Sequence, residues 1–134
     1  MKNTFLYEMQ LRGYLNQCTD IDRLNEISSK KSISAYIGFD CTASSLHVGS
    51  LVQIMILKLM QKYGHRPIVL LGGGTTLIGD PSGKDTTRKI LNSKEIKKNI
   101  KSIKKIFDKI LYSSNKNTRP IFVDNSKWLT KLNL

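Results

Sequence analysis

The strongest constraint on the fold is a strand–helix–strand unit in the first half of the chain. Residues 34–39 are short and largely apolar and carry two aromatic rings, which predicts a strand. Residues 47–63 carry apolar side chains around much of a helix, and residues 67–71 form an uninterrupted apolar run, as in a buried parallel strand. Because such a helix joins two parallel strands by a right-handed crossover, the sequence predicts an α/β fold.

The remaining predicted elements extend this unit in both directions. They are expected at residues 4–14, 20–27, 94–111 (a long amphipathic helix capped by Ser93) and 120–123 (a third strand), with a last helix beginning near residue 126. We expect an N-terminal helical segment, residues 1–33, and an incomplete Rossmann-like domain, residues 34–134, whose parallel sheet carries helices on both faces. Three strands are few for a doubly wound sheet, so the chain resembles the first half of a larger one.

Composition argues against several classes of protein. An apolar content of 40% argues against disorder, and no apolar run approaches the roughly 18 residues of a membrane helix. The N-terminus lacks the apolar core of a secretory signal, so we expect a cytoplasmic protein without a membrane partner. Cys18 and Cys41 lack a Cys-x-x-Cys spacing, which favours a reducing compartment and indicates neither a disulfide framework nor a metal site.

The net charge of +12 is unevenly distributed along the chain. Residues 1–83 hold eight Lys and Arg against six Asp and Glu, whereas residues 84–134 hold fourteen against four. Such a basic segment attracts polyanions such as RNA or nucleotides, but lysines without interleaved aromatic residues also form solvated surfaces. Charge alone leaves both interpretations open.

Two glycine-rich stretches follow the second predicted strand. Residues 79–84 read Gly-Asp-Pro-Ser-Gly-Lys, but three residues separate the glycines, one fewer than in a Walker loop, and Asp85 replaces its Ser or Thr. Residues 72–74 are three glycines with no later glycine at the dinucleotide-binding spacing. A flexible turn and a backbone held close to a ligand explain this triplet equally well.

Polar residues gather between the first predicted strand and the helix that follows it. Residues 40–45 are rich in turn and N-cap residues, and His47 stands at the expected helix start as either a surface cap or a catalytic group. Tyr36, in a buried strand, is expected to be an ordinary core residue, and Asp80 is either a turn residue or a carboxylate aimed at an ammonium group. Because ligands of open α/β sheets bind at the carboxyl ends of strands, and phosphates bind helix N-termini, we expect the ligand site here.

Four segments together resemble one family. They are residues 36–49, 64–67, 72–75 and 77–84, with Gly-Phe-Asp-x-Thr in the first and Ile-Gly-Asp-Pro-Ser-Gly in the last. At this distance the two motifs closely resemble the bacterial and organellar tyrosyl-tRNA synthetases, over nearly the whole chain. Those enzymes are class I synthetases, so the resemblance implies a Rossmann-like nucleotide-binding domain.

The resemblance also implies a reaction and an ATP site. The family activates L-tyrosine with ATP, accompanied by Mg²⁺, to tyrosyl-adenylate and transfers the tyrosine to its tRNA. The implied ATP-binding residues are Gly38, Asp40, Thr42, His47 and Gly49. Among these, Thr42 and His47 bind the transferring polyphosphate and count as catalytic, the Asp40 backbone contacts the α-phosphate, and adenine packs on Gly49. No metal ligand is implied.

Other roles follow from the same resemblance. Tyr36 would read the phenol of the substrate, and Asp80 would hold its ammonium group. Lys84 and Arg88 would be catalytic basic residues of a loop that closes over pyrophosphate. The family is usually homodimeric, and it binds tRNA mainly through C-terminal regions beyond Leu134.

The chain departs from the family pattern at two positions and in length. Ser50 replaces the last His of the His-x-Gly-His signature, and Cys41 replaces the proline of Asp-Pro-Thr. Because the second signature loop of the family is missing, we expect that this 134-residue chain alone does not aminoacylate tRNA. Two alternatives remain open: another class I-type nucleotidylyltransferase, and a non-enzymatic basic RNA-binding fragment.

Overall fold

The fold is built on a parallel three-stranded sheet. The computed structural model describes residues 4–78 and 91–132. The strands are β1 (Ser34–Asp40), β2 (Arg66–Gly72) and β3 (Ile121–Asp124), hydrogen-bonded in the order β1-β2-β3. Both pairings are parallel, as predicted for the unit of residues 34–71. The α/β fold class is confirmed.

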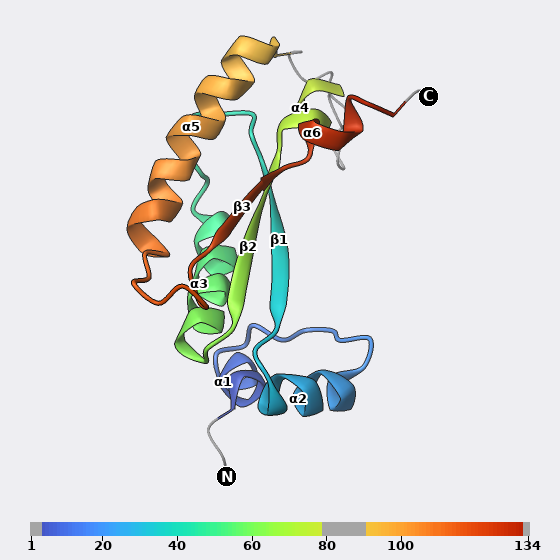
Figure 1. Ribbon diagram of the computed structural model, residues 1–134, viewed down its shortest axis with the longest axis vertical. Coiled ribbons are helices and arrows are strands. Elements are labelled where there is room, and N and C mark those ends of the chain that lie inside the picture. Colours follow the sequence, from blue (N-terminus) through green and yellow to red (C-terminus); the bar gives the residue numbers. More distant parts are fainter. Residues whose placement is uncertain (1–3, 79–90, 133–134) are drawn as a thin grey trace.

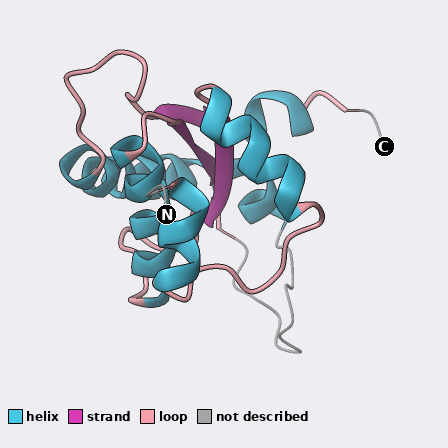
Figure 2. Cartoon of the chain, turned by 90° about the horizontal axis from the view of Figure 1, so that it is seen from below, coloured by secondary structure: helices cyan, strands magenta, loops and turns pink. Residues whose placement is uncertain are grey.

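Six helices connect and flank the strands within the described residues. They are α1 (Phe5–Leu11), α2 (Ile21–Lys30), α3 (Gly49–Lys62), α4 (Gly73–Ile78), α5 (Ser93–Ile110) and α6 (Ser126–Leu129). In Figure 1, α1 and α2 lie below the amino ends of the strands, whereas α4 and α6 lie beyond their carboxyl ends. Figure 2 views the molecule from the α1 and α2 end. None of these helices is both long and apolar enough to cross a membrane.

One face of the described sheet forms the core. In β2 the alternate residues Pro67, Val69 and Leu71 are buried, while the residues between them are only half-buried. Phe107 of α5 packs edge-to-face on Phe39 of β1, with ring centroids 4.7 Å apart. In the described part of the chain, α3 and α5 lie on the same side of the sheet (Figure 1). The opposite face therefore remains open there, and the helices predicted for both faces are found on one face only within the described residues.

Two predicted helix ends are confirmed, and one helix cap lies one residue earlier than predicted. Asp20 caps α2 as predicted, accepting a hydrogen bond from the Arg23 N–H at 2.8 Å. The α5 cap is Asn92 and not Ser93, because Asn92 and Glu95 form a reciprocal capping box. Gly64 has a φ of +78° after the end of α3, the left-handed conformation expected of a C-terminal glycine.

The glycine triplet forms no flexible turn. Gly72 ends β2, and Gly73 and Gly74 begin the short helix α4, which the sequence did not predict. A Cβ on Gly73 would collide with the Asp124 carboxylate, and one on Gly74 would lie 3.1 Å from the Ser126 Cα. These glycines therefore let the segment after β3 pack directly on the α4 backbone.

Glu8 joins the N-terminal helices to the sheet domain. Its carboxylate accepts hydrogen bonds from Lys62 at 2.7 Å and from the Tyr63 hydroxyl at 2.7 Å, both near the end of α3. Arg12 of the following turn donates to the same carboxylate. Lys62, then Tyr63 and Arg12, lower the pKa of Glu8 from 4.5 to about 2. The boundary at residue 33 stays a prediction, since α1 residues belong to the common core.

We expect Glu8→Gln to destabilise the fold at neutral pH more than Glu26→Gln, because Glu26 pairs only within α2. The folded-state pKa of Glu8 is depressed, so its stabilisation is fully present above about pH 4.5 and is lost as pH falls toward 2. Urea unfolding between pH 7 and pH 2.5 measures both effects. An unchanged pH dependence in Glu8→Gln would show that Glu8 does not link these elements.

Candidate functional site

The carboxyl ends of the three strands lie at the same edge of the sheet. Asp40 pairs with Gly72 across β1 and β2, and Leu71 pairs with Asp124 across β2 and β3. A cavity of about 750 Å³ opens beside the end of β1 and the first turn of α3. This is the position predicted for the ligand site, and its volume suits a nucleotide-sized ligand.

The structure brings most of the predicted ATP residues together. Gly38, Asp40, Thr42 and His47 line the cavity, and so does Ser50, the residue that departs from the family signature. The side chains of Asp40, Thr42 and His47 are exposed and that of Ser50 is half-buried, so a ligand can reach all four. Asp80, Lys84 and Arg88 lie outside the described residues.

His47 is held by the backbone of the helix it precedes. Its Nδ1 accepts a hydrogen bond from the Gly49 N–H at 3.1 Å, which satisfies one of the unpaired N–H groups at the start of α3. The neutral imidazole therefore carries its proton on Nε2, which becomes a hydrogen-bond donor. A Cβ on Gly49 would lie 3.3 Å from His47 Nδ1, so glycine leaves room for this contact. His47 is thus a cap of the helix start, and its catalytic role stays a prediction.

Tyr36 is not a core residue. It is 66% exposed and does not line the cavity. Because side chains alternate along a strand, Tyr36, Gly38 and Asp40 share the open face of β1, opposite Phe39. A Cβ on Gly38 would meet no atom within 4 Å, so the backbone between Tyr36 and Asp40 is accessible. These residues form a flat track of about 13 Å that leads to the cavity.

Three residues that sequence reasoning missed hold the strand ends in place. Thr76 of α4 accepts a hydrogen bond from the Cys41 N–H at 3.2 Å, and Asn99 of α5 donates to the Cys41 carbonyl at 3.0 Å. Asn125, after β3, accepts from the Gly74 N–H at 2.7 Å. Asn99 had one detectable signal, since it is a polar residue beside the apolar stripe of an otherwise lysine-rich helix.

Cys41 is a structural residue in this arrangement. Its side chain is fully buried, and burial raises the pKa of its thiol to about 11. A thiol in this state is a poor nucleophile at neutral pH. Cys18 is the exposed cysteine, and both are free thiols. Among the described residues, no group of three or more His, Cys, Asp or Glu side chains could hold a metal ion.

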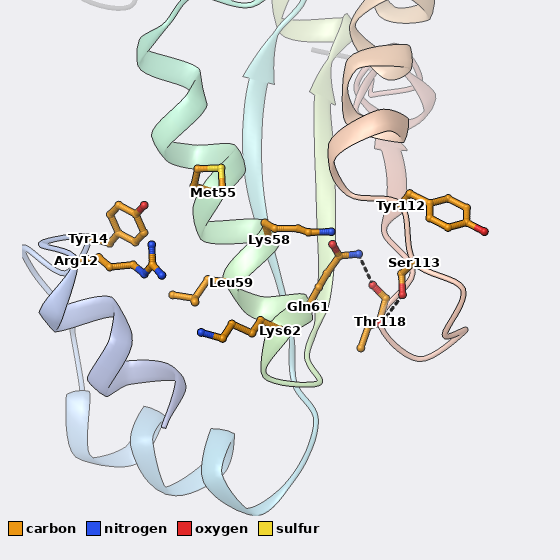
Figure 3. A pocket seen from close by; sticks show the side chains of 10 residues that line it. All are labelled: Arg12, Tyr14, Met55, Lys58, Leu59, Gln61, Lys62, Tyr112, Ser113 and Thr118. Atoms are coloured by element: carbon orange, nitrogen blue, oxygen red, sulfur yellow. Dashed lines mark hydrogen bonds between the residues drawn. The ribbon is translucent and has the colours of Figure 1, made fainter. Parts of the chain in front are cut away.

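A second cavity of about 420 Å³ lies beside the carboxyl end of α3. Figure 3 shows Arg12 and Tyr14 on one side of it, α3 side chains such as Lys58 in the middle, and the loop of Ser113 and Thr118 on the other. It shares no lining residue with the strand-end cavity. Of the predicted site residues that the structure describes, Gly38, Asp40, Thr42 and His47 line the strand-end cavity, whereas Tyr36 and Gly49 line neither of these two cavities.

A parallel α/β sheet with a cavity between the end of its first strand and the N-terminus of the next helix is typical of nucleotide-binding α/β domains. The chain belongs to the family described as tRNA synthetases class I (W and Y), whose sequence model matches residues 28–134. The resemblance to tyrosyl-tRNA synthetases is thereby confirmed at the level of the family.

Individual relatives agree with this assignment. The chain is 60% identical over 131 residues to the tyrosine–tRNA ligase of Pelagibacter ubique, covering 98% of this chain and 32% of that enzyme. It is 55% identical to the tyrosine–tRNA ligase of Rickettsia prowazekii, covering 97% of this chain and 32% of that enzyme. A C-terminally truncated mitochondrial tyrosyl-tRNA synthetase of Aspergillus nidulans superposes with a TM-score of 0.83 at 29% identity, covering 99% of this chain and 40% of that chain. This chain thus spans about a third of the length of the curated relatives it matches.

We expect Asn125→Ala to lower the free energy of unfolding by about 1–3 kcal/mol, because it leaves the buried Gly74 N–H without its acceptor. The matched control is Asn115→Ala, which removes an acceptor of the exposed Asn117 N–H and is expected to cost less than about 0.5 kcal/mol. Urea unfolding of the two variants makes the comparison. Equal destabilisation would show that the Asn125 contact does not anchor α4.

Proposed function

We propose that this chain is the N-terminal part of a tyrosine–tRNA ligase and supplies the ATP-binding side and one wall of the tyrosine site. The observation that carries the proposal is the open face of β1, where Tyr36, Gly38 and Asp40 lead to the cavity that Thr42 and His47 line. Such a track suits an elongated ligand made of an aromatic amino acid joined to AMP.

The phosphates of ATP bind at the start of α3. The helix dipole places partial positive charge there, the Thr42 hydroxyl can donate, and His47 Nε2 is available as a donor. These donors stabilise the negative charge that builds on the polyphosphate when the tyrosine carboxylate attacks the α-phosphorus. Mg²⁺ arrives with ATP and needs no protein cage of its own. The adenine ring lies against Gly49.

The tyrosine lies along the open face of β1. The Tyr36 hydroxyl reads the substrate phenol, so phenylalanine would leave that polar group without its partner. Asp80 holds the substrate ammonium group, and Lys84 and Arg88 neutralise pyrophosphate. The tRNA and a second subunit are further proposed partners. We place the reaction in the cytoplasm, where the two free thiols remain reduced.

We expect Thr42→Val and His47→Ala each to weaken ATP binding about fivefold, as the removal of one hydrogen bond predicts. The matched control is Ser44→Ala, an exposed residue of the same turn that does not line the cavity. The measurement is the concentration of MgATP that raises the melting temperature, since a ligand of the folded state stabilises it. Equal ATP dependence in all four proteins would refute the proposed phosphate site.

The chain alone is expected to show no tyrosine-dependent ATP–pyrophosphate exchange, because it spans about a third of its relatives. The assay uses the 134-residue chain with tyrosine, with phenylalanine and with no amino acid. Robust tyrosine-dependent exchange would overturn this expectation. Exchange driven by another acceptor would instead favour a different class I-type nucleotidylyltransferase.

A second candidate function, RNA binding, is favoured by the surface of α5. Seven lysines of this helix are exposed, and none forms an ion pair with a described acidic residue: Lys94, Lys97, Lys98, Lys101, Lys104, Lys105 and Lys109. The apolar face of α5 is buried through Ile103 and Phe107, so the helix has no free apolar face for a membrane. Its basic face suits the phosphates of an RNA strand.

Replacing Lys97, Lys98, Lys101 and Lys105 by Gln is expected to make RNA binding less dependent on salt. The log–log slope should fall by about 0.7 for each phosphate that the helix no longer neutralises. The control is Lys30→Gln with Lys31→Gln at the end of α2, where Lys30 already pairs with Glu26. Fluorescence anisotropy with a labelled single-stranded RNA at several salt concentrations gives the slopes. Identical slopes would remove α5 as an RNA-binding surface.

A further inference from the structure

The turn that carries the predicted phosphate-binding residues has little support of its own. Residues 41–46 form no backbone–backbone hydrogen bond with any part of the chain that the structure describes. The turn nevertheless sets where Asp40 and Thr42 stand relative to the cavity. Something outside the turn must hold its backbone, since a buried polar backbone group without a partner is costly.

Both backbone groups of Cys41 are satisfied by side chains from elsewhere. The Cys41 N–H donates to Thr76 Oγ1 at 3.2 Å, and the Cys41 carbonyl accepts from Asn99 Nδ2 at 3.0 Å. Thr76 is itself buried, and the Cys41 side chain between the two contacts is fully buried. Side chains from α4 and α5, which are distant in the sequence, therefore hold the N–H and the carbonyl of the same residue.

We propose that Thr76 and Asn99 are positioning residues that clamp Cys41 and thereby fix Asp40 and Thr42 for phosphate binding. The role of this clamp in phosphate binding rests on the proposed function. The clamp itself is supported by the two hydrogen bonds to Cys41 alone. Asn99 acts as a donor here, so an aspartate of the same shape cannot replace it at neutral pH. Likewise, Val matches Thr76 in shape but cannot accept the Cys41 N–H.

The buried Cys41 thiol offers a direct readout of this clamp. Cys18 is exposed and reacts with a thiol reagent at once, which provides an internal reference in every variant. Cys41 reacts only when the turn opens. We expect Asn99→Asp and Thr76→Val each to raise the rate of Cys41 labelling by 5,5′-dithiobis(2-nitrobenzoate) about fivefold under native conditions.

The control separates the clamp from a general loosening of α5. Asn92→Ala removes the cap of the same helix but leaves the Asn99 contact intact. Its Cys41 labelling rate is expected to stay within about twofold of wild type, since helix ends fray locally. Urea unfolding of each variant gives the rate of labelling through global unfolding, which is subtracted. Equal acceleration in Asn92→Ala and Asn99→Asp, or none in Asn99→Asp and Thr76→Val, would overturn the clamp.

MgATP then tests the two proposals separately. If the turn binds phosphate, saturating MgATP slows Cys41 labelling in the wild type, and Asn99→Asp needs about fivefold more MgATP for the same protection. Acceleration in the variants without any ATP protection would keep the clamp and reject the phosphate site. ATP protection that is equal in the wild type and the variants would keep the phosphate site and reject the positioning role.

Discussion

Parallel pairing of β1 with β2 is the interaction on which the rest of the structure depends. Its register sets Asp40 beside Gly72, so the turn after β1 and the glycines after β2 begin at the same edge. Parallel strands cannot be joined by a tight hairpin, and each connection must cross over the sheet. The crossovers therefore start at the same edge, and polar residues that follow β1 line the cavity there.

Side chains from segments later in the chain hold the ends of the paired strands in place. Asn125 follows β3 and holds the Gly74 N–H, while Thr76, two residues further along α4, holds the Cys41 N–H. Asn99 closes the arrangement from α5. The three strand ends are thus connected by side chain–backbone hydrogen bonds. The glycines at positions 73 and 74 make these contacts possible, because any side chain there would displace the β3 end.

Sequence periodicity predicted the strands, the parallel topology and most helices, because those depend on which residues are apolar and how they are spaced. It missed α4, since glycine disfavours helices and its use here depends on Asp124 and Ser126 packing against it, about 50 residues further along the chain. The sequence did not predict the exposure of Tyr36 either, because the apolar pattern of a strand does not tell which face of the sheet helices will cover. The resemblance supplied the site residues, but it gave no hint of Asn99, whose value lies in a contact 58 positions away.

The two parts of the proposed site use different physical means. Around the phosphates the proposed donors are the His47 imidazole and the Thr42 hydroxyl, and the hydrogen bond from the Gly49 N–H already orients the imidazole before charge develops. On the proposed tyrosine side, selectivity would rest on one phenol on an open strand face, with no side chain at Gly38 to obstruct the substrate. In this proposal, phosphate binding depends on how firmly the turn at Cys41 is held, whereas amino-acid selection depends on what covers the open face. Substitution of Thr76 or Asn99 should then weaken ATP binding without changing the preference for tyrosine over phenylalanine.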